Sequence, residues 1–314
     1  MKELVVISGK GGTGKTSLTA SLAALAEPVV LVDCDVDAAD LHLVLRPHVR
    51  RQGRFTGGSK ARVKHGQCTA CGKCEELCRF DAIYFDGPGN GRVPRTFRVD
   101  ELACEGCGVC ADFCTDRAIE FKPRISGQWF ISDTRCGPMV HARLAPGAEN
   151  SGKLVTELRH AAQQIAARKG LELVIGDGSP GIGCPVIASL TGASYALIVA
   201  EPTASGLHDF ERIAQLASRL DVPAALVVNK ADLNPQVADR LEAAARARGV
   251  DPLGQVPYDR DVTLAQIAAR SVVETSTGPA SQALRAVWGQ LERRLKSSAA
   301  PAPAELVQLA ARSP

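Results

Sequence analysis

The stretch SGKGGTGKTS, which begins at Ser8, has the residue types and spacing of a phosphate-binding loop. It fits the pattern G-x-x-x-x-G-K-[ST], whose fixed positions are Gly9, Gly14, Lys15 and Thr16. Glycines allow backbone N–H groups to approach a phosphate, and a helix that starts after the loop adds partial positive charge. An apolar run, LVVIS, precedes the loop and a run of helical composition, TSLTASLAALA, follows it, which is the context that this motif requires. Lys15 would hold the β- and γ-phosphates of a nucleotide. The residues that we expect to contact the nucleotide here are Gly9, Lys10, Gly11, Gly12, Thr13, Gly14, Lys15, Thr16 and Ser17.

Three further apolar runs end in polar side chains. VVLVD ends at Asp33 and is followed by Asp35, LELVIGD ends at Asp177, and AALVVN ends at Asn229. Continuous apolar strands are typical of parallel sheets that helices cover on both faces, and ligands there gather at the carboxyl ends of the strands. We therefore expect an α/β fold with a mostly parallel sheet and helices on both faces. At one edge of this sheet Thr16, Asp33 and Asp177 would bind Mg²⁺ beside the phosphates.

Eight of the eleven cysteines follow one spacing twice. Each run reads C-x2-C-x2-C-x3-C, and RFDAIYF after the first run aligns with TDRAIEF after the second. In a reducing compartment such thiols are better explained by metal than by disulfides. A zinc ribbon also uses C-x2-C pairs, but zinc needs only four ligands, whereas two regular quartets are typical of two iron–sulfur clusters. The eight residues are Cys68, Cys71, Cys74, Cys78, Cys104, Cys107, Cys110 and Cys114.

The duplicated spacing resembles that of a two-cluster bacterial ferredoxin. In such proteins three thiolates of one run bind a [4Fe–4S] cluster, and the fourth ligand comes from the other run. The proline that usually follows the fourth cysteine is absent, because Arg79 and Thr115 stand there. The resemblance implies one cluster on Cys68, Cys71, Cys74 and Cys114, and a second on Cys104, Cys107, Cys110 and Cys78.

KGGTGKT and VDCDVDAADLHLVL together resemble the deviant Walker ATPases of the MinD/ParA type, a group related to the Mrp-type cluster carriers and the nitrogenase iron protein. The resemblance implies an ATP-induced dimer in which Lys10 reaches the nucleotide of the partner, while Asp35 positions the attacking water. Lys10, Lys15 and Asp35 would then be the catalytic residues. Because phosphoryl transfer depends on positioning and charge neutralisation, a cation supplied by the partner can control it. The C-x-x-C near the carboxyl terminus of the Mrp-type carriers is absent.

The base side of the expected pocket allows two interpretations. NKAD, which spans Asn229 to Asp232, has the spacing with which GTPases read guanine through an aspartate. VPYD, which spans Val256 to Asp259, resembles the base-side loop of the ATPase family and favours ATP. The expected base-side residues are Asn229, Lys230, Pro257 and Asp259.

The order of the motifs predicts an insertion. The ATPase motifs occupy both ends of the chain and the cysteine runs lie between them, so we expect an inserted α+β ferredoxin-like domain. The expected parts are a first ATPase segment over 1–55, the ferredoxin-like domain over 60–122, a second ATPase segment over 125–295 and a flexible tail over 296–314.

The segments around the insertion carry further local signals. Residues 46–66 include seven Lys or Arg and no acid. They predict either a solvated linker, which we favour, or a docking surface for an acidic partner. Helices are expected over 206–220, 235–249 and 283–295, and residues 149–151 are expected to cap the helix that follows them.

Composition excludes several classes of protein. The net charge of +3 does not indicate nucleic-acid binding. No apolar run reaches the roughly 18 residues of a spanning helix, and the first residues lead directly into a strand, so we expect a cytoplasmic protein without membrane attachment.

The sequence therefore favours an ATP-hydrolysing iron–sulfur protein with ATP, Mg²⁺ and two [4Fe–4S] clusters as cofactors. Its dimer, with itself or with a paralogue, would couple hydrolysis to assembly or transfer of clusters or a metal cofactor. One alternative is an ATP-gated electron donor, and another is a positioning ATPase whose clusters sense redox state. In the first two cases the partner is a protein client that accepts clusters or electrons.

Overall fold

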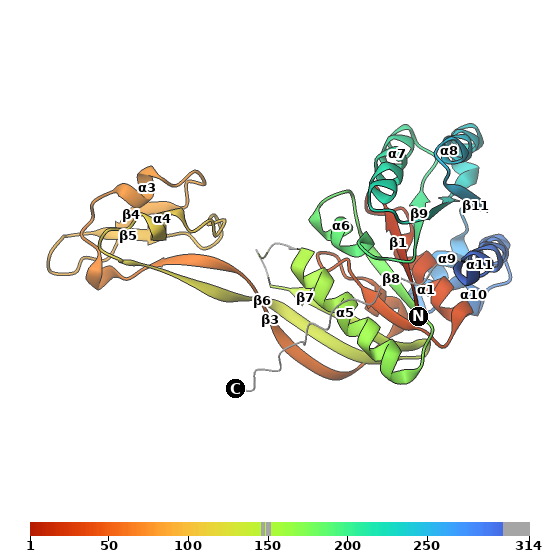
Figure 1. Cartoon of the computed structure of the whole chain (residues 1–314), viewed down its shortest axis with the longest axis horizontal. Helices are drawn as coiled ribbons and strands as arrows, with labels where there is room; N and C mark the ends of the chain where they lie inside the picture. Colours follow the sequence, from red (N-terminus) through yellow and green to blue (C-terminus); the bar gives the residue numbers. More distant parts are fainter. Residues whose placement is uncertain (146–147, 149–151, 298–314) are drawn as a thin grey trace. The chain divides into compact units, whose positions relative to one another are not determined.

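The computed structural model describes residues 1–145, 148 and 152–297 and divides into two compact units (Figure 1). We call residues 1–53, 128–144 and 152–297 the sheet unit, and residues 54–127 with 145 and 148 the cysteine unit. Most of the expected ATPase segments fall in the sheet unit, except residues 54–55, 125–127, 145 and 148, and the eight cysteines of the two runs fall in the cysteine unit. The chain passes from one unit to the other within two long strands.

Seven strands of the sheet unit are parallel to their neighbours, in the order β11–β10–β9–β1–β8–β2–β7. Most of their residues are buried, which explains why they read as unbroken apolar runs. Because the strands are parallel, their carboxyl ends share one edge. The strands are β1 (Lys2–Ser8), β2 (Val30–Asp33), β7 (Gly137–Leu144), β8 (Leu173–Pro180), β9 (Tyr195–Ala200), β10 (Ala224–Asn229) and β11 (Asp251–Val256).

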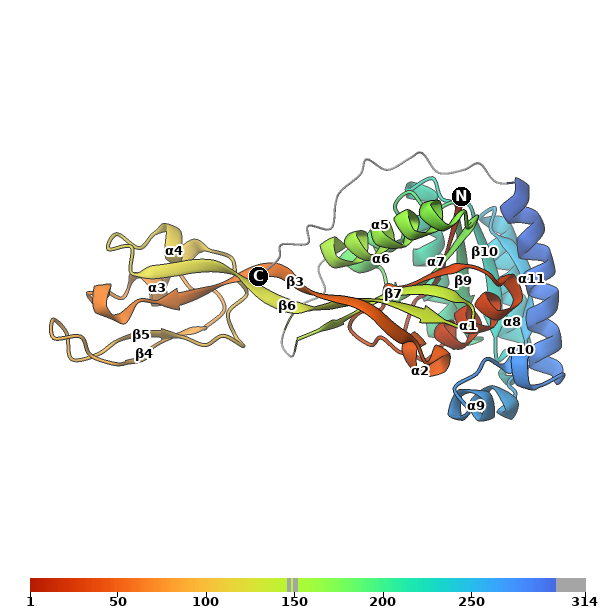
Figure 2. The same ribbon diagram turned by 90° about the horizontal axis from the view of Figure 1, so that it is seen from below.

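Helices cover both faces of this sheet (Figure 2). Alternate residues of β1 pack in opposite directions: Leu4 and Val6 join one core with α1 and α11, whereas Val5 and Ile7 join the other with α6, α7 and α8. The expected parallel α/β architecture is therefore confirmed. The helices of the first core are α1 (Lys15–Ala26), α2 (Leu41–Leu45), α9 (Arg260–Ile267), α10 (Val272–Thr275) and α11 (Pro279–Ser297). On the other side lie α5 (Gly152–Lys169), α6 (Cys184–Leu190), α7 (Ala204–Arg219) and α8 (Pro235–Ala247).

The helices expected over 206–220, 235–249 and 283–295 are confirmed as α7, α8 and α11. On α11 the side chains of Leu284, Val287, Leu291 and Leu295 are all buried. Residues 149–151, expected to cap a helix, and most of the expected tail, 298–314, lie outside the described residues. Among the helices of the described ranges, none has the length and apolar character that crossing a membrane requires.

The expectation of a solvated linker over residues 46–66 is wrong. Most of this segment is β3 (His48–Val63), which ends the sheet order β7–β6–β3 beside β6 (Ile119–Thr134). Its glycines and cations resemble a linker in composition, but β6 pairs with one side of its backbone. Edge strands often carry cationic side chains, since these oppose pairing with other chains. Arg50 on β3, for example, donates to Asp133 on β6 at 2.7 Å.

The cysteine unit repeats a small pattern. Two four-residue helices, α3 (Lys73–Glu76) and α4 (Val109–Asp112), each begin after a glycine with positive φ, 84° at Gly72 and 81° at Gly108. Strands β4 (Ile83–Gly87) and β5 (Thr96–Val99) pair antiparallel. The buried residues of this unit include Phe97 and Ile119, and six of the eight cysteines of the two runs lie in or against the same cluster, whereas Cys71 and Cys107 are exposed.

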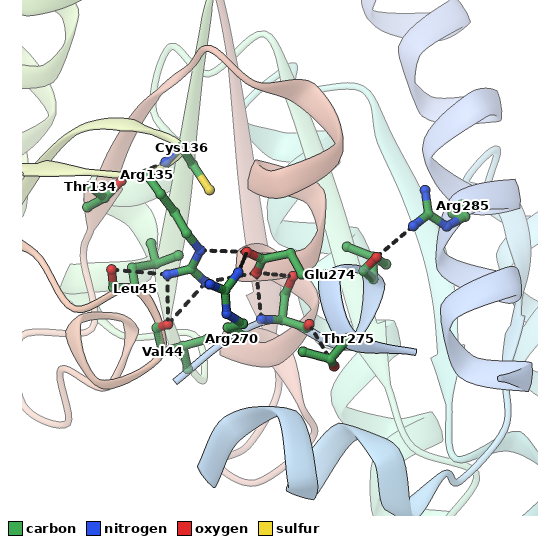
Figure 3. Close-up of polar contacts among 11 residues, drawn as sticks. Val44, Leu45, Thr134, Arg135, Cys136, Arg270, Glu274, Thr275 and Arg285 are labelled. Atoms are coloured by element: carbon green, nitrogen blue, oxygen red, sulfur yellow. Dashed lines mark hydrogen bonds and ion pairs between the residues drawn. The ribbon is translucent and has the colours of Figure 1, made fainter. Parts of the chain in front are cut away.

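One ion-pair network joins three segments of the sheet unit (Figure 3). Arg135, between β6 and β7, donates to both carboxylate oxygens of Glu274 on α10, at 2.6 and 2.8 Å. The same guanidinium donates to the carbonyls of Val44 and Leu45 at the end of α2. Glu274 also accepts hydrogen bonds from the backbone and hydroxyl of Ser271, which completes a capping box.

This network predicts a pH-dependent contribution to stability. Burial alone would raise the pKa of Glu274, but Arg135 and Ser271 outweigh it and lower the pKa to about 2. A carboxyl with a lowered pKa stabilises the fold above its unfolded value and loses that contribution as the pH falls through the folded value. We expect Glu274→Gln to lower the free energy of unfolding by about 2 kcal/mol at pH 7, and by less at pH 3.

Urea unfolding of the wild type and the variant at both pH values measures this difference. Glu292→Gln is the control, because Glu292 pairs with Lys296 on the exposed face of α11. An equal loss at pH 7 and pH 3 would contradict the assigned pKa.

Candidate functional site

The phosphate loop lies between β1 and α1, at the carboxyl edge of the sheet. Gly12 and Gly14 have φ values of 81° and 88°, which favour glycine. A Cβ on Gly9 would lie 2.2 Å from Cβ of Asp209 on α7, and one on Gly14 would lie 2.3 Å from Nδ2 of Asn229. Two of the glycines in the motif are thus required by close approach of neighbouring elements.

Lys15 and Thr16 meet Asp177 at the start of α1. The Lys15 ammonium donates to Oδ1 of Asp177 at 2.8 Å, and the Thr16 hydroxyl donates to Oδ2 at 2.6 Å. Thr19, one turn further along α1, donates to Oδ1 at 3.0 Å. Asp177 is fully buried, and three side chains of α1 donate hydrogen bonds that hold its carboxylate in place.

Two more carboxylates follow β2 beside this lysine. Oδ2 of Asp35 lies 3.4 Å from the Lys15 ammonium. Asp33 instead accepts the backbone N–H groups of Asp35 and Leu41, at 3.1 and 3.3 Å. Of the three expected Mg²⁺ ligands, the structure thus brings Thr16 and Asp177 into contact, while the carboxylate of Asp33 is held by backbone N–H groups.

Three carboxyl groups lie around one ammonium group in this site. Burial and the neighbouring Asp177 raise the pKa of Asp33 well above its usual range, and burial raises that of Asp35. Burial would lower the pKa of Lys15, but Asp177 and Asp35 outweigh it and raise the pKa instead. An additional cation in this pocket would favour the ionised forms of the carboxyls.

Lys10 points back onto its own chain. Its ammonium lies 3.2 Å from Oε2 of Glu201, the residue after β9, and the other oxygen of Glu201 lies 2.5 Å from the Lys230 ammonium. Lys230 also donates to the carbonyl of Gly12 at 3.1 Å. Lys10 and Lys230 therefore meet at one carboxylate.

A pocket of about 240 Å³ opens beside the loop. Asn229 forms part of it and donates to the carbonyl of Thr13 at 2.7 Å. Gln266 of α9 also faces it and donates to the Ser17 hydroxyl at 2.6 Å, so α9 reaches the phosphate loop. The expected base-side residues that line this pocket are Asn229, Lys230, Pro257 and Asp259.

Asp232, the residue that would read guanine, is engaged elsewhere. Its Oδ1 accepts the backbone N–H of Tyr258 at 2.5 Å, and it is not among the residues that line the pocket. Asp259 caps α9 by accepting the N–H of Asp261 at 2.9 Å. The NKAD aspartate thus joins the two loops that follow β10 and β11.

The cysteine unit gathers the eight cysteines of the two runs around two small pockets. In both, three cysteines of one run are joined by the last cysteine of the other run. One pocket is lined by Cys68, Cys71, Cys74 and Cys114. The other is lined by Cys78, Cys104, Cys107 and Cys110.

Backbone N–H groups approach several of these sulfurs. Ala82 donates to Sγ of Cys78 at 3.5 Å and Ala118 donates to Sγ of Cys114 at 3.3 Å, two contacts at the same offset in the two runs. Burial raises the pKa of Cys74 to about 11, so without a bound cation this thiol stays protonated at neutral pH. Across the described ranges, no three His, Cys, Asp or Glu side chains are grouped closely enough for a single metal ion.

The three remaining cysteines lie in the sheet unit. Cys34 and Cys136 are buried, and burial raises the pKa of Cys136 to about 11, which makes it an unreactive thiol. Cys184 is exposed at the first residue of α6.

Two residues of the site, Glu201 and Gln266, were not predicted from the sequence. Glu201 follows the buried run YALIVA in the same way that Asp177 follows the apolar run LELVIG, so the signal that located Asp177 was present for Glu201 too. Gln266 lies on a short helix whose sequence shows no signal for a base contact.

Comparisons with known proteins agree with this geometry. The chain is 34% identical over 236 residues to MJ0578 of Methanocaldococcus jannaschii, covering 74% of this chain and 79% of that protein. It is 26% identical over 236 residues to MJ0579 of the same organism, covering 73% and 81%. The septum site-determining protein MinD of Pyrococcus horikoshii, solved with Mg-ADP, superimposes with a TM-score of 0.56 at 16% identity, covering 93% of this chain and 96% of that one.

A family description matches most of the chain. The CobQ/CobB/MinD/ParA nucleotide binding domain covers residues 4–272, which include the phosphate loop, Asp177 and most residues of the pocket beside the loop. The chain therefore belongs to the CobQ/CobB/MinD/ParA nucleotide-binding family.

Proposed function

We propose that this protein is an ATP-hydrolysing iron–sulfur protein. A dimer that forms on ATP binding would couple hydrolysis to the assembly or transfer of an iron–sulfur cluster or metal cofactor. The observation that carries the proposal is the joining, in one chain, of a nucleotide loop to two pockets of four cysteines each.

The loop geometry supports nucleotide hydrolysis. Lys15, held by Asp177 and Asp35, lies where it can exchange carboxylate for the β- and γ-phosphates. The buried hydroxyl of Thr13 is without a hydrogen-bond partner in the described structure, so it has a donor to offer a phosphate oxygen. Asp35 would position the attacking water, and hydrolysis would yield ADP and phosphate.

Magnesium and ATP fit the same site. Thr16 and Asp177 already touch, and a divalent cation between them would favour the ionised forms of the carboxyls. The cation would neutralise negative charge on the phosphate oxygens during phosphoryl transfer. We assign ATP rather than GTP, because the Asp232 carboxylate accepts the N–H of Tyr258 and does not line the pocket beside the loop.

The cysteine pockets suit [4Fe–4S] clusters. In such a cluster each thiolate binds a different iron, so the ligands surround a cavity and need not converge as they do on one ion. The crossed quartets of the two pockets match the ligand sets that the ferredoxin resemblance implies. Donation from Ala82 and Ala118 would stabilise the thiolate form of two ligands. A bound cluster would supply one-electron redox chemistry or transferable iron and sulfide.

A second function, ATP-gated electron donation, is favoured by one observation. Each pocket has a complete set of four cysteines, and completely ligated clusters suit permanent residence as well as delivery. In either case the partner is a protein client that accepts clusters or electrons. M. jannaschii has two relatives of this chain, MJ0578 and MJ0579, which is consistent with pairing between paralogues as well as with a homodimer.

Labelled iron separates the two functions. The protein is reconstituted anaerobically with labelled iron and sulfide, then mixed with an apo-ferredoxin acceptor with and without Mg-ATP. A carrier transfers label when ATP is hydrolysed, and a Lys15→Ala control transfers none.

If label stays on the chain, cluster transfer is wrong. Oxidation of the reduced clusters by an acceptor only in the presence of ATP would then identify an electron donor. A chain that retains no iron after reconstitution would remove both functions.

A further inference from the structure

Glu201 joins two lysines beside the phosphate loop. Its two carboxylate oxygens lie 3.2 Å from the Lys10 ammonium and 2.5 Å from the Lys230 ammonium. The Glu201 side chain is only 14% exposed. Although burial would raise its pKa, the hydrogen bonds from Lys230 and Lys10 lower it, so Glu201 is an anion at neutral pH.

The two lysines are held unequally. Lys230 also donates to the carbonyl of Gly12 at 3.1 Å, whereas Glu201 is the one side-chain partner of the Lys10 ammonium within the described ranges. The Lys10 side chain is the more exposed of the two, at 37% against 29%. If Lys10 moves away, Glu201 keeps Lys230 as its counterion and no unpaired charge is left behind. Lys10 is therefore the lysine that can leave.

We propose that Glu201 is a positioning residue that holds Lys10 on its own chain until a partner arrives. Association of two ATP-bound copies would then exchange this carboxylate for the phosphates of the partner's nucleotide. The inference rests on the proposed function, since it requires that Lys10 act across a dimer. Glu201 thereby raises the protein concentration at which the dimer forms. It releases Lys10 only when the phosphates of the partner's nucleotide replace its carboxylate.

Removing the charge of Glu201 tests this exchange. Glu201→Gln keeps the size of the side chain but weakens its hold on Lys10. Because exposed ion pairs are weak, we expect the dissociation constant of the nucleotide-bound dimer to fall by about twofold to fivefold. Sedimentation velocity with Mg²⁺ and AMPPNP measures it over a range of protein concentrations.

The matched control is Glu211→Gln on α7. Glu211 pairs with one cation, Arg248, in an ion pair whose side chains are both 40% exposed, and it contacts neither Lys10 nor Lys230 in the described structure. This variant should associate as the wild type does. A Glu201→Gln dimer that is unchanged or weaker would overturn the proposal, because loss of a merely structural contact does not tighten association.

A second readout needs no dimer. Acetylation of lysines in the nucleotide-free protein, followed by peptide mass spectrometry, reports how freely the Lys10 amine reacts. Glu201→Gln should raise the labelling rate of Lys10 about twofold or more relative to Glu211→Gln, and an unchanged rate would overturn the hold on Lys10. A rise in Lys10 labelling in Glu201→Gln, together with a wild type that does not associate with AMPPNP, would contradict the dimer of the proposed function. It would also contradict the exchange of Glu201 for the phosphates of the partner's nucleotide.

Discussion

Lys10→Ala is expected to bind ATP but to hydrolyse it about a thousandfold more slowly than the wild type, or slower still. In the single chain the Lys10 ammonium contacts Glu201 and lies outside the contacts that hold Asp177, so its removal leaves the Lys15 site intact. A cation supplied to the transferring phosphate from outside the site is worth about 10³ to 10⁵ in rate. The loss should therefore fall on the chemical step.

The matched variant is Lys15→Ala, which is expected to affect ATP binding rather than the chemical step. Lys15 is buried between Asp177 and Asp35, and its removal leaves the carboxylates facing the phosphates without a counterion. We expect ATP binding itself to be lost. Fluorescent-nucleotide titration measures binding and phosphate release measures turnover. Normal turnover by Lys10→Ala would show that this lysine has no part in hydrolysis.

The second large effect concerns which cysteines would share a cluster in the proposed function. Each pocket combines three cysteines of one run with the last cysteine of the other. The iron that remains after two cysteines are replaced therefore depends on whether the two belong to the same pocket or to different pockets. Cys71→Ser with Cys114→Ser removes two ligands from one pocket and should leave about four of about eight iron atoms. Cys71→Ser with Cys78→Ser removes one ligand from each pocket and should leave about none.

Iron and acid-labile sulfide per chain after anaerobic reconstitution measure both variants. The near-ultraviolet and visible absorbance of the remaining cluster gives an independent check. Ligation of each cluster by a single run predicts the reverse, with Cys71→Ser/Cys78→Ser keeping one cluster and Cys71→Ser/Cys114→Ser losing both. That reversal would contradict the arrangement of the two pockets.

The sequence by itself determined the local chemistry and much of the fold. The glycine loop, its lysine and the strand that precedes it were predictable because a phosphate site needs those residues at fixed spacing within one continuous segment. The apolar runs that end at Asp33, Asp177 and Asn229 indicated a parallel sheet, since buried strands need apolar side chains on both faces. The leucine spacing of α11 identified its buried face for a similar reason.

Only the tertiary structure decided which distant groups meet. No spacing in the sequence relates Lys10 to Glu201 or Asp232 to the N–H of Tyr258, because these contacts depend on how crossover connections order the strands. Residues 46–66 were misread for the same reason: β3 exists because β6 pairs with it, and its partner lies about seventy residues away in the chain. Local patterns specify what a segment can do, whereas long-range pairing decides what it contacts.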